Sequence, residues 1–165
     1  MKLKNLVLSL SKDDILNLIA LQDKTIIKKL DLGNKINASG IYKLVGLNIE
    51  FDTSMTISTF KSNIIYIDIN NFQISGKSSS NPLVKGSIAL LTKSINDIEG
   101  MNLKDKVLTI DIEKIVKVYC TDTYGIKLDK LDINTLKTSN GCFEFGINIL
   151  DINLGNLKNL NNLKK

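Results

Sequence analysis

The chain has 165 residues, of which 43% are hydrophobic and 24% are charged, a composition typical of one folded domain. All 22 basic residues are lysine and histidine is absent, which excludes histidine-based metal sites, a histidine proton shuttle and the bidentate contacts of arginine. The net charge of +5 is spread along the chain without a stripe of lysines and aromatics, so no nucleic-acid partner is predicted.

The amino-terminal stretch does not have the pattern of an export signal. Asn5, Ser9 and Lys12 interrupt its apolar residues, and no small-residue cleavage site follows. Nowhere do about 18 apolar residues run together, as a membrane-spanning helix needs. Cys120 and Cys142 are widely spaced and are predicted to be free thiols of a reducing compartment. A cytoplasmic location is therefore predicted, with non-classical export left open.

The first predicted elements are a strand and a short helix. Leu6, Leu8 and Leu10 alternate as in a strand. Ser11 and Asp14 then form a capping box, which predicts the start of an amphipathic helix over 11–22. The predicted inward stripe of this helix contains Ile15, Leu18, Ile19 and Gln22. The following stretch, 25–40, does not favour one element.

From residue 41 the apolar pattern has period two, which predicts long antiparallel strands with one apolar face. A turn or kink is predicted at 52–54. Elsewhere the period shifts by one residue, and such shifts indicate β-bulges, which bend a sheet. The shifts occur near 58–60, 70–71, 128–131 and 150–152. Their number favours a strongly curved, bulged antiparallel sheet.

The strongest predicted helix spans 82–98, between Pro82 and Gly100. An interior glycine, Gly86, costs about 1 kcal/mol, which suggests a close approach and the opening of a cavity there. The apolar stripe of the helix comprises Val84, Ile88, Leu91, Ile95 and Ile98. The sheet is expected to face this stripe with Val45, Leu47, Ile49, Phe51, Ile65 and Ile67.

The carboxy-terminal half continues with a strand at 107–112, a helix near 111–120 and a final hairpin with its turn at 139–141. Residues 1–155 are predicted to form a single α+β domain. Residues 156–165 form an Asn/Lys-rich tail with leucines at every third position, predicted to be frayed.

The chain contains short matches to known catalytic and phosphate-binding motifs, but each match is incomplete or lies in the wrong structural context. Ser58 and Lys61 spell S-x-x-K, but they lie between predicted strands rather than at the start of a helix. Ser75 to Ser78 resembles the end of a phosphate-binding loop, but Asn71 stands where its first glycine is required. Pairs of acidic residues occur in the chain, but none has a third metal ligand at a recognised spacing. No enzyme activity, metal or cofactor is therefore predicted.

The order of these elements resembles that of the tubular lipid-binding (TULIP) superfamily, in particular its small single-domain bacterial members and the related neurotoxin-cluster accessory proteins. The resemblance covers roughly residues 3–150 and rests on the order of strands and helices. It implies a curved sheet wrapped around a central amphipathic helix, with acyl chains in the apolar groove between them. Extracytoplasmic members carry an export signal, which is not recognised here.

The sequence therefore predicts non-enzymatic binding of a lipid or fatty-acyl ligand between helix 82–98 and the sheet. Lysines at the mouth would meet an anionic headgroup or weakly contact an anionic membrane surface. The alternative is an interaction or scaffold module with a filled core, which binds a protein partner or forms homo-oligomers. Such a module would associate through strand edges or the tail leucines Leu157, Leu160 and Leu163.

Overall fold

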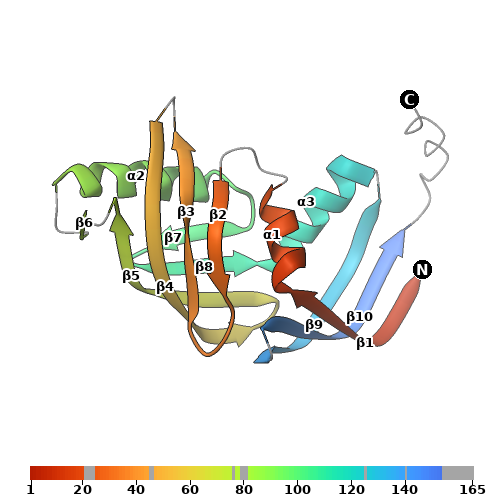
Figure 1. Ribbon diagram of the computed structural model, residues 1–165. Helices are drawn as coiled ribbons and strands as arrows, with labels where there is room; N and C mark the ends of the chain where they lie inside the picture. The colour runs from red at the N-terminus through yellow and green to blue at the C-terminus, as the bar shows by residue number, and fades with distance from the viewer. Residues whose placement is uncertain are drawn as a thin grey trace.

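The computed structural model describes residues 1–20, 25–44, 47–75, 77–78, 82–124, 126–139 and 141–153, and these residues form two antiparallel sheets and three short helices (Figure 1). In chain order the elements are β1 (Lys2–Ser11), α1 (Lys12–Ala20), β2 (Thr25–Asp31), β3 (Ile36–Leu44), β4 (Leu47–Lys61), β5 (Ile64–Ile74), β6 (Lys77–Ser78), α2 (Pro82–Asn96), β7 (Met101–Lys104), β8 (Val107–Asp111), α3 (Ile112–Tyr124), β9 (Lys127–Ser139) and β10 (Cys142–Asn153). The α+β class is confirmed. The predicted tail, 156–165, lies outside the described residues.

The larger sheet has the order β2-β3-β4-β5-β8-β7, with β6 paired to β5, and the smaller sheet has the order β1-β10-β9. Two hairpins of the larger sheet have two-residue turns in the left-handed backbone region, which matches the twist of the paired strands. Ser62 (φ 52°) and Asn63 (φ 66°) connect β4 to β5, and Asp105 (φ 50°) and Lys106 (φ 66°) connect β7 to β8. Of the two alternatives predicted at 52–54, the turn is wrong, because β4 continues through these residues, whereas the pairing of β4 with β5 shifts between Ser54 and Met55, at the end of this segment.

The strand pairings confirm the predicted register shifts. Pairing between β4 and β5 shifts between Ile57 and Thr59, and again where Ser54 opposes Asn71 and Met55 opposes Ile69. Pairing between β9 and β10 shifts after Asp151. The shift at 70–71 returns the later apolar residues of β5 to the face of the earlier ones, so the face stays apolar along its length.

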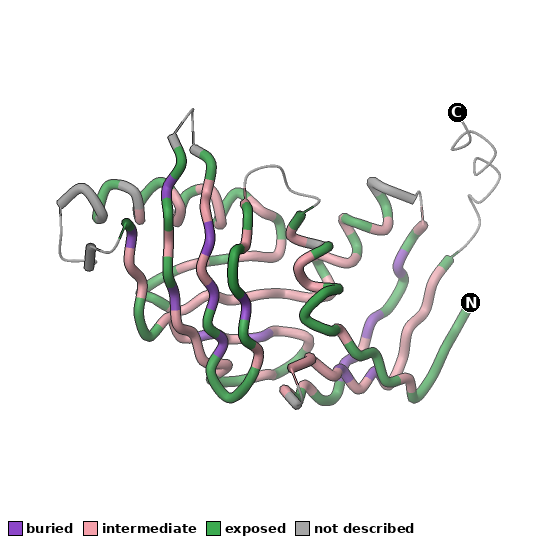
Figure 2. The backbone as a smooth tube through the Cα atoms, viewed as in Figure 1, coloured by how far each residue is buried: buried purple, intermediate pink, exposed green. Residues whose placement is uncertain are grey.

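This apolar face of the larger sheet is covered by different elements along its length. The main core cluster joins Ile65 and Ile67 of β5 to the smaller sheet, where Phe145 and Ile147 are 8% and 7% exposed. A second cluster, around Leu30, packs against α1. A third cluster joins β4 and β5 to α2. Figure 2 shows buried residues distributed over both sheets rather than around one helix.

The finer expectation, one curved sheet wrapped around a central helix, is not what the described residues show. The strands divide between two sheets, and α2 lies against β7. The smaller sheet covers the half of β5 that was expected to face the helix. No helix in the described ranges is both long and apolar enough to cross a membrane.

Candidate functional site

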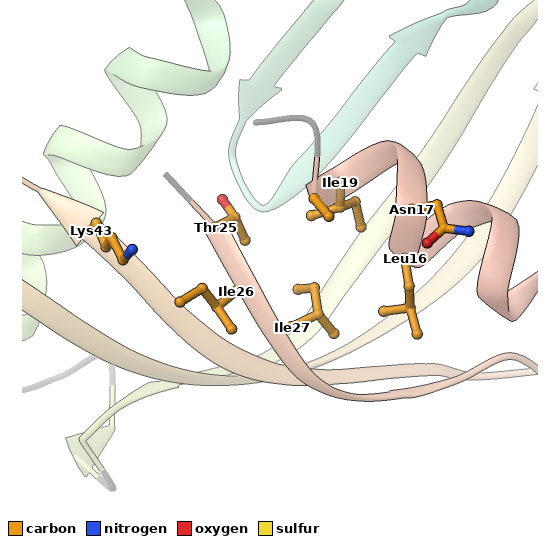
Figure 3. Close-up of a pocket in the computed structure, with 8 residues that line it drawn as sticks. Leu16, Asn17, Ile19, Thr25, Ile26, Ile27 and Lys43 are labelled. Carbon is orange, nitrogen blue, oxygen red and sulfur yellow. The ribbon is translucent and has the colours of Figure 1, made fainter. Parts of the chain in front are cut away.

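An open groove of about 410 Å³ lies between α1 and the β2–β3 edge of the larger sheet (Figure 3). Three half-buried apolar side chains, Leu16, Ile19 and Ile27, form much of its wall. Ile26 lines it as well and remains 44% exposed. The groove thus includes apolar side chains that the described residues leave partly uncovered.

Polar groups complete the lining. Asn17 contributes from α1, Thr25 from β2 and Lys43 from β3. In Figure 3 the Lys43 side chain lies beyond Ile26, away from the α1 wall. Lys43 is the one charged residue among the described lining residues. A ligand that carries an anionic group at one end therefore fits the charge of this groove.

The α1 wall is fixed by the capping box that the sequence predicts. The Ser11 backbone N–H donates to Asp14 Oδ2 at 2.8 Å, and the Asp14 N–H donates to Ser11 Oγ at 3.2 Å. The hydrogen bonds from Ser11 hold the pKa of the Asp14 carboxyl below its usual 3.8. The carboxylate therefore stays ionised at the helix start, where the helix dipole favours negative charge.

The β2 wall depends on a glycine in the neighbouring strand. A Cβ at Gly40 would lie 2.2 Å from the Ile26 carbonyl oxygen. The pairing of β2 with β3 shifts between Ile27 and Lys29, next to this contact. Gly40 therefore permits the close approach that sets the position of Ile26 and Ile27 in the groove.

The residues predicted to bind an apolar ligand are only partly brought together. Ile88 and Leu91 of α2 pack on Ile49, with Ile74 and Phe72, which the prediction did not include. Ile95 and Ile98 are half-buried, and so is Phe51, which pairs with Ile74. Val45 and the side chains of Leu47 and Val84 lie outside what the structure describes.

Ile65 and Ile67 do not face α2 but belong to the core between the two sheets. The reason is distance along β5, since the seven residues from Ile67 to Ile74 span about 23 Å of extended chain. Nor does any described atom lie within 4 Å of a Cβ built at Gly86. The close approach predicted at this glycine is therefore not seen among the described residues.

A cluster of polar side chains forms around Asn63 in the turn between β4 and β5. Asn63 Nδ2 donates to the Leu131 carbonyl at 2.8 Å and to Glu113 Oε2 at 3.1 Å, and Asn63 Oδ1 accepts the Ile133 N–H at 2.8 Å. Hydrogen bonds from Lys117 and Asn63 hold the pKa of Glu113 below its usual 4.5, against the opposing effect of burial. All partners are satisfied, so this cluster holds the sheets together and offers no free group for chemistry.

Other sites for chemistry are not apparent among the described residues. Ser58 lies inside β4, with Oγ 3.2 Å from both the Tyr66 carbonyl and Asp68 Oδ1. No group of three metal-ligating side chains is found in the described part of the chain. The thiols of Cys120 and Cys142 are not joined in a disulfide.

Sequence reasoning missed the groove because the stretch that forms its β2 wall had no clear pattern. The run Thr25 to Ile27 contains two adjacent apolar residues, one directed to the core and one left exposed. The available signal was Gly40, which lies inside β3 rather than at a turn, because a glycine within a strand often marks a close approach of another backbone.

Comparisons with protein-family models, curated proteins and solved structures give no match to this chain. The resemblance to the TULIP superfamily stays a prediction that rests on the order of elements.

Proposed function

We propose that this protein is a non-enzymatic binding protein that takes an amphipathic ligand, with an apolar chain and an anionic head, in the groove between α1 and β2. The observation that carries the proposal is that most of the described lining residues of this groove are apolar and that Lys43 is the one charged residue among them. Its volume of about 410 Å³ lies within the range of about 300–1,000 Å³ typical of ligand pockets. It suits one acyl chain rather than a whole bilayer lipid.

The α2 cluster supports binding less well. Ile88 and Leu91 already contact Ile49 and Ile74, both of which are 8% exposed or less. A ligand there would have to displace packed side chains, whereas the α1 groove has space already formed. We therefore place the ligand beside Ile26 rather than beside α2.

A fluorescent fatty-acid titration of the purified protein tests the site. Ile26→Glu introduces a carboxylate into the apolar lining, where it repels the anionic probe and cannot be desolvated cheaply, so binding should be lost. Leu90→Glu is the matched control, because Leu90 is an apolar side chain on α2 with a similar exposure of 50%, and it should bind as the wild type does. Equal binding by Ile26→Glu and wild type would refute the site.

The head of the ligand is tested separately at Lys43. Lys43→Gln should weaken binding of a fatty-acid anion and leave binding of the fatty alcohol of equal length unchanged, because only the anion interacts with the ammonium group. Equal losses for acid and alcohol would show that Lys43 contributes contact area rather than charge. Native mass spectrometry of the protein as purified would identify what occupies the groove.

A further inference from the structure

Strand β1 has a free edge with an unusual amount of exposed apolar surface. It is the end strand of the smaller sheet, and no strand of the described residues pairs with its other side. Val7 is 76% exposed and Leu8 46%. Figure 1 places β1 at the margin of the molecule, and Figure 2 shows it exposed over most of its length.

The other sheet edges carry features that discourage pairing with another strand. β2 has Lys28 and Lys29 at a register shift, and β7 has only four residues. The edge strand β9 receives the Asn63 side chain on its backbone. In β1 such features are found only in the first half of the strand. They are the charges of Lys2 and Lys4 and the left-handed backbone of Asn5 (φ 54°). The segment from Leu6 to Leu10 contains no charge.

The backbone of this segment is oriented to accept a further strand. The Ser11 N–H donates to Asp14 and so points away from β10. Backbone groups of alternate residues in an extended strand point to the same side, and the pairing with β10 is regular from Leu6 to Ser11. The N–H and C=O groups of Val7 and Ser9 therefore point to the free edge.

We propose that two copies of this chain associate through antiparallel pairing of β1 with β1, with the two-fold axis at Leu8. In this register Val7 of each copy exchanges backbone hydrogen bonds with Ser9 of the second copy. The two smaller sheets then form one continuous sheet, as in β-strand addition. Leu8 lies on the face of Phe145, so the apolar face continues across the axis and Leu8 becomes covered.

The charges of β1 and α1 favour a second copy of this chain over an unrelated strand. Lys2 and Lys4 precede the pairing segment, and Asp13 and Asp14 follow it. Antiparallel pairing brings the basic end of each copy beside the acidic end of the other. Lys12 lies among the acids and reduces this complementarity, so a concentration-dependent dimer is expected rather than a permanent one.

Sedimentation velocity over a range of protein concentration tests the association. The wild type should shift from monomer to dimer, and Val7→Lys should stay monomeric at concentrations where the wild type dimerises, because it places two like charges beside the axis. Val7 is largely exposed, so this variant should fold normally. Leu90→Lys on α2 is the matched control and should dimerise. A monomeric wild type, or a dimeric Val7→Lys variant, would overturn the proposal.

Oxidative cross-linking tests the register. Leu8→Cys places two thiols opposite each other at the axis, so it should form covalent dimers faster than Val7→Cys or Ser9→Cys. Wild type treated in parallel reports any cross-linking through Cys120 and Cys142. Faster cross-linking at Val7→Cys or Ser9→Cys would overturn the axis at Leu8.

Discussion

The interface between the two sheets and the groove beside α1 are built from the same kinds of residue, yet one is closed and the other open. Ile147 and its neighbours are at most 8% exposed because β5 and β10 cover each other. Ile26 lies in a strand of similar composition but at a sheet edge, and it is 44% exposed. An apolar strand residue therefore contributes to stability or to binding according to what covers it.

The largest effect that this difference predicts is on stability. Ile147→Ala should lower the free energy of unfolding by about 2–5 kcal/mol, because it leaves a cavity in the core between the sheets. Ile26→Ala, the same change in the groove, should cost no more than about 0.5 kcal/mol, since solvent already reaches that side chain. Urea denaturation of both variants measures the contrast. Equal losses would show that the groove is as well packed as the core.

The polar cluster at Asn63 predicts the next largest effect. Asn63→Ala leaves the Leu131 carbonyl and the Ile133 N–H without their partner, which should cost about 1–3 kcal/mol. Asn134→Ala is the control, because it removes an exposed hydrogen bond to Asn148 at 2.9 Å and leaves water to replace it. A loss for Asn63→Ala no greater than for this control would mean that the turn does not hold the sheets together.

The features that the sequence predicts correctly depend on neighbours close in the chain. The Ser11–Asp14 capping box and the bulges of β4 and β5 are visible in local patterns. The β7–β8 hairpin was not predicted, because its strands are short and Asp105-Lys106 is not a common turn pair for its left-handed backbone. The groove was not predicted either, since it depends on a contact between Gly40 and Ile26 of different strands.

Replacing each of two glycines by alanine should change the stability of the protein in opposite directions. Gly40→Ala should destabilise the protein by about 1–3 kcal/mol through overpacking against the Ile26 backbone, and it should weaken ligand binding by displacing β2. Gly86→Ala should stabilise the protein by about 0.5–1 kcal/mol, because Gly86 is an exposed glycine inside α2 with open space around it. Thermal denaturation measures both. Destabilisation by Gly86→Ala would indicate a close contact at this helix.

The smallest expected effect is a dependence of stability on pH at the polar cluster of Asn63 and Glu113 between the two sheets. Glu113 has a folded-state pKa below the usual 4.5 because Lys117 and Asn63 donate hydrogen bonds to its carboxylate. Its contribution to stability is therefore complete above the unfolded-state pKa and is lost as the pH falls through the folded-state pKa.

Asp14 follows the same rule at the start of α1, where Ser11 lowers its pKa. Denaturation midpoints measured from neutral pH to about pH 3 should fall less steeply for Glu113→Gln than for wild type. Because the Lys117 partner is 45% exposed, added salt should reduce the difference between the two proteins. Parallel pH profiles for wild type and Glu113→Gln would place the acid sensitivity elsewhere, with Asp14→Asn as the next variant to measure. Acid should also weaken the α1 wall of the groove, because protonation of Asp14 removes the carboxylate that accepts the Ser11 hydrogen bonds at the start of α1.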